Sequence, residues 1–270
     1  MGMSTYRVRA SSWASLFDCG FRWEGIHLLN LPNIVGLRAA LGTAIHAGTA
    51  AYDQSRIDKS GLTVDDAAGV LIDKLHDPEN EFDQNKDDLT MPEAEYIGIG
   101  LLSKYCKQIS PRYDFAAVEM ETESLEIDCG DGVIVQLTGT MDRARVCRKT
   151  EGIGIADVKS GSAAVSNGVA KTRGHGPQLG TYEILFEHTT GQRVTADAEI
   201  IGLQTNGKLA IGTGTVSNAK AMMLGTEDQP GLIEFAARMF RSGDFYPNSK
   251  SLLCSARYCP RHSTCPFTEK

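Results

Sequence analysis

Two carboxylates and a lysine in the middle of this 270-residue chain have the spacing of a metal-dependent catalytic site. Asp157 and Lys159 lie two positions apart in a segment that starts with apolar residues at Ile153, and residues two apart on a strand face the same side of a sheet. Asp142 lies in the segment before, so its carboxylate could lie beside Asp157. Two carboxylates can hold a divalent cation, which polarises a phosphate and lowers the pKa of a bound water. Because a charged pair at the end of a buried strand costs desolvation, a functional role is favoured over a plain salt bridge.

Other polar residues could complete such a site. His46 could be a third ligand for Mn²⁺ or Mg²⁺, although a lone histidine beside an apolar helical stripe is more often an interior side chain. Gln178 and Tyr182 are four apart, so on a helix they share one face and could contact a phosphate or a base. The glycine-rich loop before them carries Lys171 and Arg173, which could meet a DNA backbone.

The order of these residues resembles the RecB-type nucleases of the PD-(D/E)XK superfamily. The matching motifs are Gly42-x-x-x-His46, Gly139-x-x-Asp142, Asp157-x-Lys159 and Gln178-x-x-x-Tyr182. The resemblance implies that the histidine and the two aspartates ligate Mg²⁺ or Mn²⁺, that the lysine is catalytic, and that the glutamine and tyrosine contact substrate. Glu119 stands where relatives often have an acidic residue, and it receives less weight. The implied fold is an α/β restriction-endonuclease-like core, with a mixed central β-sheet flanked by helices.

The cysteines suggest a second metal centre. There are seven, and Cys19 stands near the start while Cys254, Cys259 and Cys265 lie close together near the end. One cysteine before the core and three after it resembles the CRISPR spacer-acquisition nucleases and the AddB nuclease domain, which implies a [4Fe–4S] cluster that holds the C-terminal tail. Four residues separate Cys254 from Cys259, where those families usually have two, so a zinc site that uses His262 stays open.

Periodicity and turn residues predict one α/β domain over residues 1–270, in which a helical region (about 11–110) precedes a catalytic core (about 111–215) and a C-terminal helix with the cysteine cluster (about 226–270). A helix capped by Ser11 or Ser12 should open the chain. The other predicted helices cover residues 38–57, 63–76, 92–109, 177–188 and 228–242. The predicted strands cover 115–128 and 133–147, joined by a turn at 129–132, then 153–159, and 196–204 and 208–212, joined at Asn206-Gly207.

The net charge of -7 is unfavourable for an enzyme that binds nucleic acid. The charge is unevenly distributed, however, because residues 77–95 hold eight carboxylates against one lysine, whereas residues 238–261 hold five basic residues against one aspartate. Such a separation can present a basic groove on an acidic body. The sequence contains neither a membrane-length apolar run nor a signal peptide pattern, which predicts a soluble cytoplasmic protein of a bacterium or a phage-infected cell, with no membrane partner.

The leading hypothesis is therefore a metal-dependent DNA nuclease, more an exonuclease than an endonuclease, that acts on DNA ends or single strands in recombination or repair. A recombination protein or a single-strand-binding protein would be its partner. One alternative is a CRISPR spacer-acquisition nuclease. Two alternatives of other classes are a catalytically silent DNA-binding module with a structural metal cluster and an interaction protein that does not bind nucleic acid.

Overall fold

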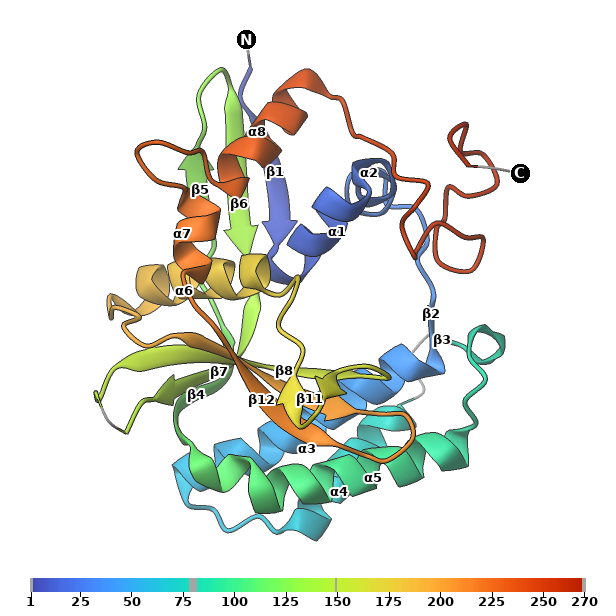
Figure 1. The fold of residues 1–270 in the computed structure, drawn as a ribbon, viewed down its shortest axis with the longest axis vertical. Coiled ribbons are helices and arrows are strands. Elements are labelled where there is room, and N and C mark those ends of the chain that lie inside the picture. Colours follow the sequence, from blue (N-terminus) through green and yellow to red (C-terminus); the bar gives the residue numbers. More distant parts are fainter. Residues whose placement is uncertain (1, 78–81, 149, 269–270) are drawn as a thin grey trace.

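The computed structural model describes residues 2–77, 82–148 and 150–268, and its central element is a seven-stranded sheet with the order β4-β7-β8-β11-β12-β10-β9 (Figure 1). These strands are β4 (Asp114–Glu121), β7 (Thr140–Val146), β8 (Ile153–Gly161), β11 (Ala198–Gln204), β12 (Ile211–Val216), β10 (Val169–Ala170) and β9 (Val165–Ser166). Strand β8 pairs with β11 in parallel, whereas β4–β7, β7–β8 and β11–β12 are antiparallel. The predicted mixed central sheet is therefore confirmed.

Helices cover both faces of this sheet, as predicted (Figure 1). One face carries α3 (Leu37–Asp58), α4 (Val64–Leu75) and α5 (Met91–Gln108), and the other carries α6 (Gly176–Thr190). Capping boxes at Thr63 and Thr90 begin α4 and α5, because each threonine side chain and the acidic residue three positions on satisfy one another's backbone N–H groups. Helices α3, α4 and α5 begin and end within one or two residues of the predicted positions.

A smaller sheet with the order β1-β6-β5 lies on the far side of α6, and the first and last helices pack around it (Figure 1). Its strands are β1 (Ser4–Arg9), β6 (Val133–Thr138) and β5 (Leu125–Asp128), and the helices are α1 (Trp13–Asp18), α2 (Gly20–His27), α7 (Ala219–Leu224) and α8 (Leu232–Ser242). Trp13, Trp23 and Phe240 are buried in its core. Strand β1 was not predicted, because its parallel partner β6 lies about 130 residues further along the chain.

Short elements complete the fold. Strands β2 (Val35–Gly36) and β3 (Phe82–Asp83) pair in parallel, and three single-turn helices are η1 (Ala10–Ser12), η2 (Gln84–Lys86) and η3 (Ser110–Arg112). Ser12 stands at the start of α1, as predicted, but its hydroxyl donates to the carbonyl of Arg9 instead of capping the helix. Of the predicted acidic stretch, Glu79 and Glu81 lie outside the described residues. No helix in the described part of the chain is long and apolar enough to cross a membrane.

The prediction of two long strands at 115–128 and 133–147 was wrong in one respect. The turn at 129–132 does join two antiparallel strands, β5 and β6, but each long segment is broken, and its other half, β4 or β7, belongs to the seven-stranded sheet. The break occurs at Gly139, whose carbonyl accepts hydrogen bonds from the N–H and the hydroxyl of Thr122 at 3.2 and 2.7 Å. The bent β-ribbon therefore contributes strands to both sheets. Residues on either side of the bend line the space between the two sheets.

A fully buried ion pair ties α3 to the central sheet. The guanidinium of Arg143 on β7 donates to the Asp53 carboxylate of α3 at 2.7 Å, and neither side chain is exposed. The same carboxylate accepts hydrogen bonds from the hydroxyls of Tyr105 and Ser110, so its oxygens are satisfied without water. A second Arg143 nitrogen donates to Glu119 on β4 at 3.2 Å, so the buried network also restrains a partly exposed carboxylate.

Replacing Asp53 with alanine should destabilise the protein by about 3–5 kcal/mol, because it leaves the Arg143 guanidinium buried without its counter-ion. The midpoint of urea unfolding measures this loss. The control is Asp114→Ala, which removes the partner of Arg148 in an exposed pair and should have little effect. Equal destabilisation by the two changes would contradict the assigned importance of the buried pair.

Glu183 should make the stability depend on pH. This α6 residue is 7% exposed and accepts a hydrogen bond from the Lys220 N–H, and burial raises the pKa of its carboxyl to about 7. Since the pKa in the folded protein lies above the unfolded value, stability is greatest at low pH and falls as pH rises through about 7. Glu183→Gln should remove this loss, raising the thermal midpoint at pH 8 by roughly 5 °C with no change at pH 4. Calorimetry measures both midpoints. If the midpoints of the variant and the unaltered protein differed by the same amount at pH 4 and pH 8, the prediction would be wrong.

Candidate metal and active site

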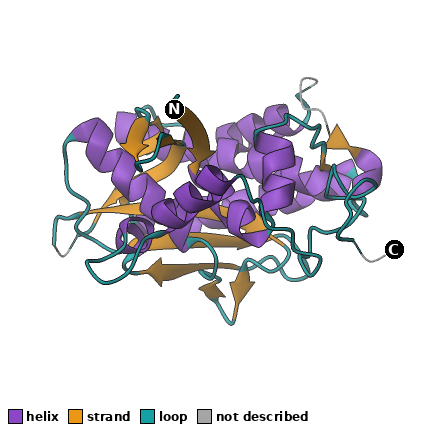
Figure 2. Ribbon diagram, turned by 90° about the horizontal axis from the view of Figure 1, so that it is seen from above, coloured by secondary structure: helices purple, strands orange, loops and turns teal. Residues whose placement is uncertain are grey.

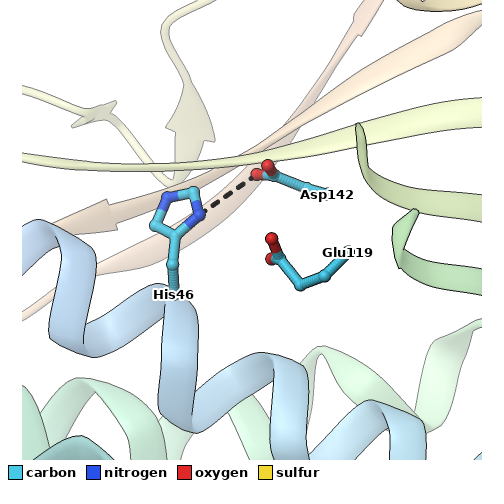
Figure 3. Close-up of side chains that lie close together, drawn as sticks. All are labelled: His46, Glu119 and Asp142. Atoms are coloured by element: carbon cyan, nitrogen blue, oxygen red, sulfur yellow. Dashed lines mark ion pairs between the residues drawn. The ribbon is translucent and has the colours of Figure 1, made fainter. Parts of the chain in front are cut away.

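Three side chains from distant parts of the chain point toward one another beside the central sheet (Figure 3). His46 comes from α3, Glu119 from β4 and Asp142 from β7, and one ligand atom from each lies within 4.8 Å of the others. The Nδ1 atom of His46 is 3.3 Å from Oδ2 of Asp142, which also accepts the Val158 N–H at 2.8 Å. Desolvation lowers the pKa of His46, which favours the neutral imidazole that a metal ion requires.

Glu119, which the motif resemblance indicated with less weight than the other residues, is the third member of this group. The pairs Val118 with Arg143 and Met120 with Met141 place Glu119 opposite Asp142 in the β4–β7 register. Its φ of 45° lies in the left-handed region, which costs a non-glycine residue about 1 kcal/mol or more and is frequent at functional sites. Desolvation and the charge of Asp142 raise the pKa of Glu119 to about 7. Nothing in the local sequence indicates this backbone conformation, so only the motif of related nucleases could have singled out the residue.

Asp157 and Lys159 of β8 face the same side of the sheet, as their spacing predicted. The Lys159 ammonium lies 2.6 Å from Oδ2 of Asp157, which is fully buried, whereas about a quarter of the lysine side chain is exposed. Burial, followed by the charge of Asp142, raises the pKa of Asp157. Asp157 lies outside the three-residue group; its Oδ1 accepts a hydrogen bond from Gln178, and its Oδ2 forms the ion pair with Lys159. Two of the three predicted ligands, His46 and Asp142, therefore lie together, and the third lies next to them.

Helix α6 brings two predicted substrate-binding residues to the same place. The Gln178 amide donates to Oδ1 of Asp157 at 3.0 Å and to the Tyr182 hydroxyl at 3.2 Å. Tyr182 is 4% exposed, and burial together with the charges of Asp142 and Asp157 raises its pKa. Both side chains therefore lie next to the acidic group. Tyr182 is more buried than a side chain that contacts substrate at the protein surface.

The other two predicted substrate contacts, Lys171 and Arg173, are exposed in the loop between β10 and α6. Their side chains are not held against the acidic group. The end of this loop does reach the site, because His175 lies close enough to Lys159 for the ammonium charge, after desolvation, to lower its pKa. The loop therefore borders the site.

The four cysteines predicted to bind a cluster line one pocket, but among the described residues their sulfur atoms do not form a group of three or more within 4.8 Å of one another. Cys19, Cys254, Cys259 and Cys265 all line this pocket and are half-buried, whereas His262 is not among its lining residues. Desolvation and then the neighbouring thiols raise the pKa of Cys254. The two ends of the chain lie apart (Figure 2), and the tail contacts the segment around Cys19.

Several contacts hold this tail. The Asn248 amide donates to the Asp18 carbonyl at 2.9 Å, and the Arg22 guanidinium donates to the Tyr258 carbonyl at 3.0 Å. Arg261 pairs with Glu24 at 2.8 Å and stacks on Phe21 at 4.0 Å. Hydrogen bonds, an ion pair and ring contacts therefore fix the tail on α1 and α2, and its three cysteines line one pocket with Cys19.

The charge pattern indicated that the basic stretch at residues 238–261 could contribute to a basic groove. Its four arginines pair with carboxylates, namely Arg238 with Glu234, Arg241 with Asp131, Arg257 with Asp87 and Arg261 with Glu24. Three of these pairs join the C-terminal region to other parts of the chain, whereas Arg238 pairs with Glu234 inside α8.

Comparison with known proteins identifies the fold and the family of the chain. The structure is similar to a solved protein named "Putative exonuclease" from Eubacterium rectale, with 13% sequence identity, a TM-score of 0.55, and 97% of this chain and 89% of that chain covered. At this identity the likeness shows a shared fold. No curated protein matches the sequence. The sequence profile of the PD-(D/E)XK nuclease superfamily matches residues 8–266, and the chain therefore belongs to that superfamily.

Proposed function

We propose that this nuclease is a metal-dependent deoxyribonuclease, and that it works as an exonuclease on DNA ends or single strands during recombination or repair. The observation that carries the proposal is the convergence of His46, Glu119 and Asp142 beside the Asp157–Lys159 pair. These residues come from four separate segments, and a chance cluster would not be expected to combine two carboxylates, an imidazole and an adjacent lysine-bound aspartate. The named exonuclease with the same fold supports the choice of exonuclease.

The donor set fits a hard divalent cation. Two carboxylate oxygens and a neutral imidazole suit Mg²⁺ or Mn²⁺, and the imidazole favours Mn²⁺. Burial, followed by the charge of Asp142, raises the pKa of both Glu119 and Asp157, and a bound cation would favour their ionised forms. A cation held by His46, Glu119, Asp142 and Asp157 would polarise the scissile phosphate and lower the pKa of a bound water.

The residues around the acidic group have separate roles in this proposal. Lys159, which contacts Asp157 and is partly exposed, donates a hydrogen bond to the attacking water or to the charged transition state. Gln178 keeps the Asp157 carboxylate oriented and shares its amide with Tyr182. Lys171 and Arg173, on the exposed loop, would contact the DNA backbone.

We also propose that Cys19, Cys254, Cys259 and Cys265 bind a [4Fe–4S] cluster with a structural role. What supports it is the common pocket of the four thiols and the short, irregular tail that carries three of them. The guanidinium of Arg22, which also lines the pocket, would offset the negative charge of a thiolate-bound cluster. A role in CRISPR spacer acquisition is the second candidate, because those nucleases have the same order of cysteines.

The proposal is tested by incubating the protein with linear duplex, circular duplex and single-stranded DNA in Mg²⁺, Mn²⁺ or EDTA. We expect degradation of the linear and single-stranded forms, no cutting of the circle, and no activity in EDTA. Asp142→Asn should abolish activity, whereas Asp114→Asn, at the opposite end of the β4–β7 pair, should not. Cutting of the circle would contradict the exonuclease assignment, and the absence of metal-dependent cleavage of any substrate would contradict the nuclease proposal.

A further inference from the structure

We propose that a groove beside the acidic group binds the phosphate backbone of the strand being cut, with Arg7 and Arg9 as its phosphate contacts. This inference rests on the proposed nuclease function and names the part of the surface that holds the substrate. The groove has a volume of about 530 Å³ and lies where the two sheets diverge. Its walls include Arg7, Arg9, Glu121, Thr138, Thr140 and Tyr182.

The groove continues directly from the acidic group. In the β4–β7 register Glu121 is opposite Thr140, two residues from the position where Glu119 faces Asp142. Two residues along a strand span about 7 Å, so the groove begins next to the acidic group. Tyr182 forms the junction, because it lines the groove while its hydroxyl accepts the hydrogen bond from Gln178.

The two arginines follow at increasing distance from the site. Strand β1 pairs with β6, so that Arg9 is opposite Thr138 and Arg7 is opposite Gln136. Thr138 is followed by Gly139 and Thr140, so Arg9 lies next to the end of β7 and Arg7 lies one further step away. Residues two apart on a strand face the same side. The guanidinium groups can therefore contact successive phosphates of one strand that leads toward Asp142.

The charge of these arginines is available to a ligand. Both are exposed, and among the described residues neither forms an ion pair with a carboxylate, unlike the four arginines of the C-terminal segment. The Arg7 guanidinium donates only a long hydrogen bond of 3.4 Å to the Thr138 hydroxyl. Glu121 is the carboxylate that lines the groove, so the two guanidinium groups outnumber it. Arginine and hydroxyl side chains are the usual contacts of nucleic-acid phosphates.

The protein is closely packed around Gly139, which lines the groove. A methyl group added at Gly139 would lie 2.8 Å from the Tyr182 ring and 3.2 Å from the Ala10 side chain. The groove volume falls within the range of sites for small ligands, enough for one or two nucleotides of single strand. We therefore assign the groove to single-stranded DNA, which a duplex end would enter after fraying.

The test measures binding of a short fluorescent oligothymidylate by anisotropy, with Ca²⁺ in place of the catalytic metal and at several salt concentrations. The double change Arg7→Gln/Arg9→Gln should raise Kd at least tenfold and reduce the slope of log K against log salt by about 1.4, since each single-strand phosphate contact contributes about 0.7. Affinity for Mn²⁺ and the thermal midpoint should stay as in the unaltered protein, because both side chains are exposed.

A matched control removes two arginines from the opposite end of the β4–β7 pair. Arg112→Gln/Arg148→Gln makes the same change in net charge about 25 Å away along the strands and should leave both Kd and salt slope unchanged. If the groove variant binds like the unaltered protein, or if both double variants weaken binding equally, the groove assignment is overturned. These outcomes differ from failure of the nuclease proposal, in which the unaltered protein would cleave no DNA.

Discussion

Replacing Lys159 with alanine is expected to reduce the rate constant for DNA cleavage about 10²- to 10³-fold, the usual cost of one hydrogen-bond donor to a charged transition state. The Lys159 ammonium lies 2.6 Å from the buried Asp157 carboxylate and remains partly exposed. It can therefore contact both the acidic group and a phosphate bound next to that group. Single-turnover cleavage of a labelled linear DNA in Mn²⁺ measures the effect on the chemical step.

Two controls separate this role from a loss of charge or of metal. Lys208→Ala, in the turn between β11 and β12, removes the same charge away from the acidic group and should leave the rate unchanged. Calorimetric titration with Mn²⁺ should show that Lys159→Ala still binds metal, because Glu119, Asp142 and His46 are retained. A single-turnover rate equal to that of the unaltered protein would refute the proposed role of Lys159.

Replacing Cys259 with serine is expected to remove the proposed cluster and to weaken the attachment of the C-terminal tail, whose contacts with α2 remain. Protein purified without oxygen should be brown, with the broad visible absorption of thiolate-to-iron charge transfer, and the variant should be colourless. Because a cluster would join residues more than 230 positions apart, its loss should also lower the thermal midpoint by on the order of 10 °C. Absorption spectra, iron and sulfide analysis and calorimetry measure the two effects.

The matched control is Cys129→Ser, which alters another half-buried cysteine that does not line the tail pocket and should preserve the colour. If the unaltered protein were colourless and contained one zinc ion, the pocket would be a zinc site and not a cluster site. If the anaerobic protein contained neither metal, or if Cys259→Ser retained the iron, the proposed site would be wrong.

The sequence by itself determined the strand that carries Asp157 and Lys159 and most of the helices. An apolar run followed by Asp-x-Lys fixes which side chains share a face, because the period of a strand is two residues. Capping boxes and apolar stripes likewise fix α4 and α5 from residues within a few positions of one another. The motif order then indicated that His46 and Asp142 belong with this strand, which is where the structure places them.

The tertiary structure alone decided how the ribbon at Gly139 divides between two sheets, which places β1 beside β6 and forms the groove at Arg7 and Arg9. It also decided that Glu119, in a left-handed backbone held by Arg143, joins the acidic group while Asp157 is held by Lys159 and Gln178. Local patterns report how neighbouring residues face, whereas pairing between distant strands and burial of ions such as Asp53 and Arg143 depend on contacts over tens of residues. Because those long-range contacts shape the site, the sequence indicated candidate residues but could not define how they are arranged in space.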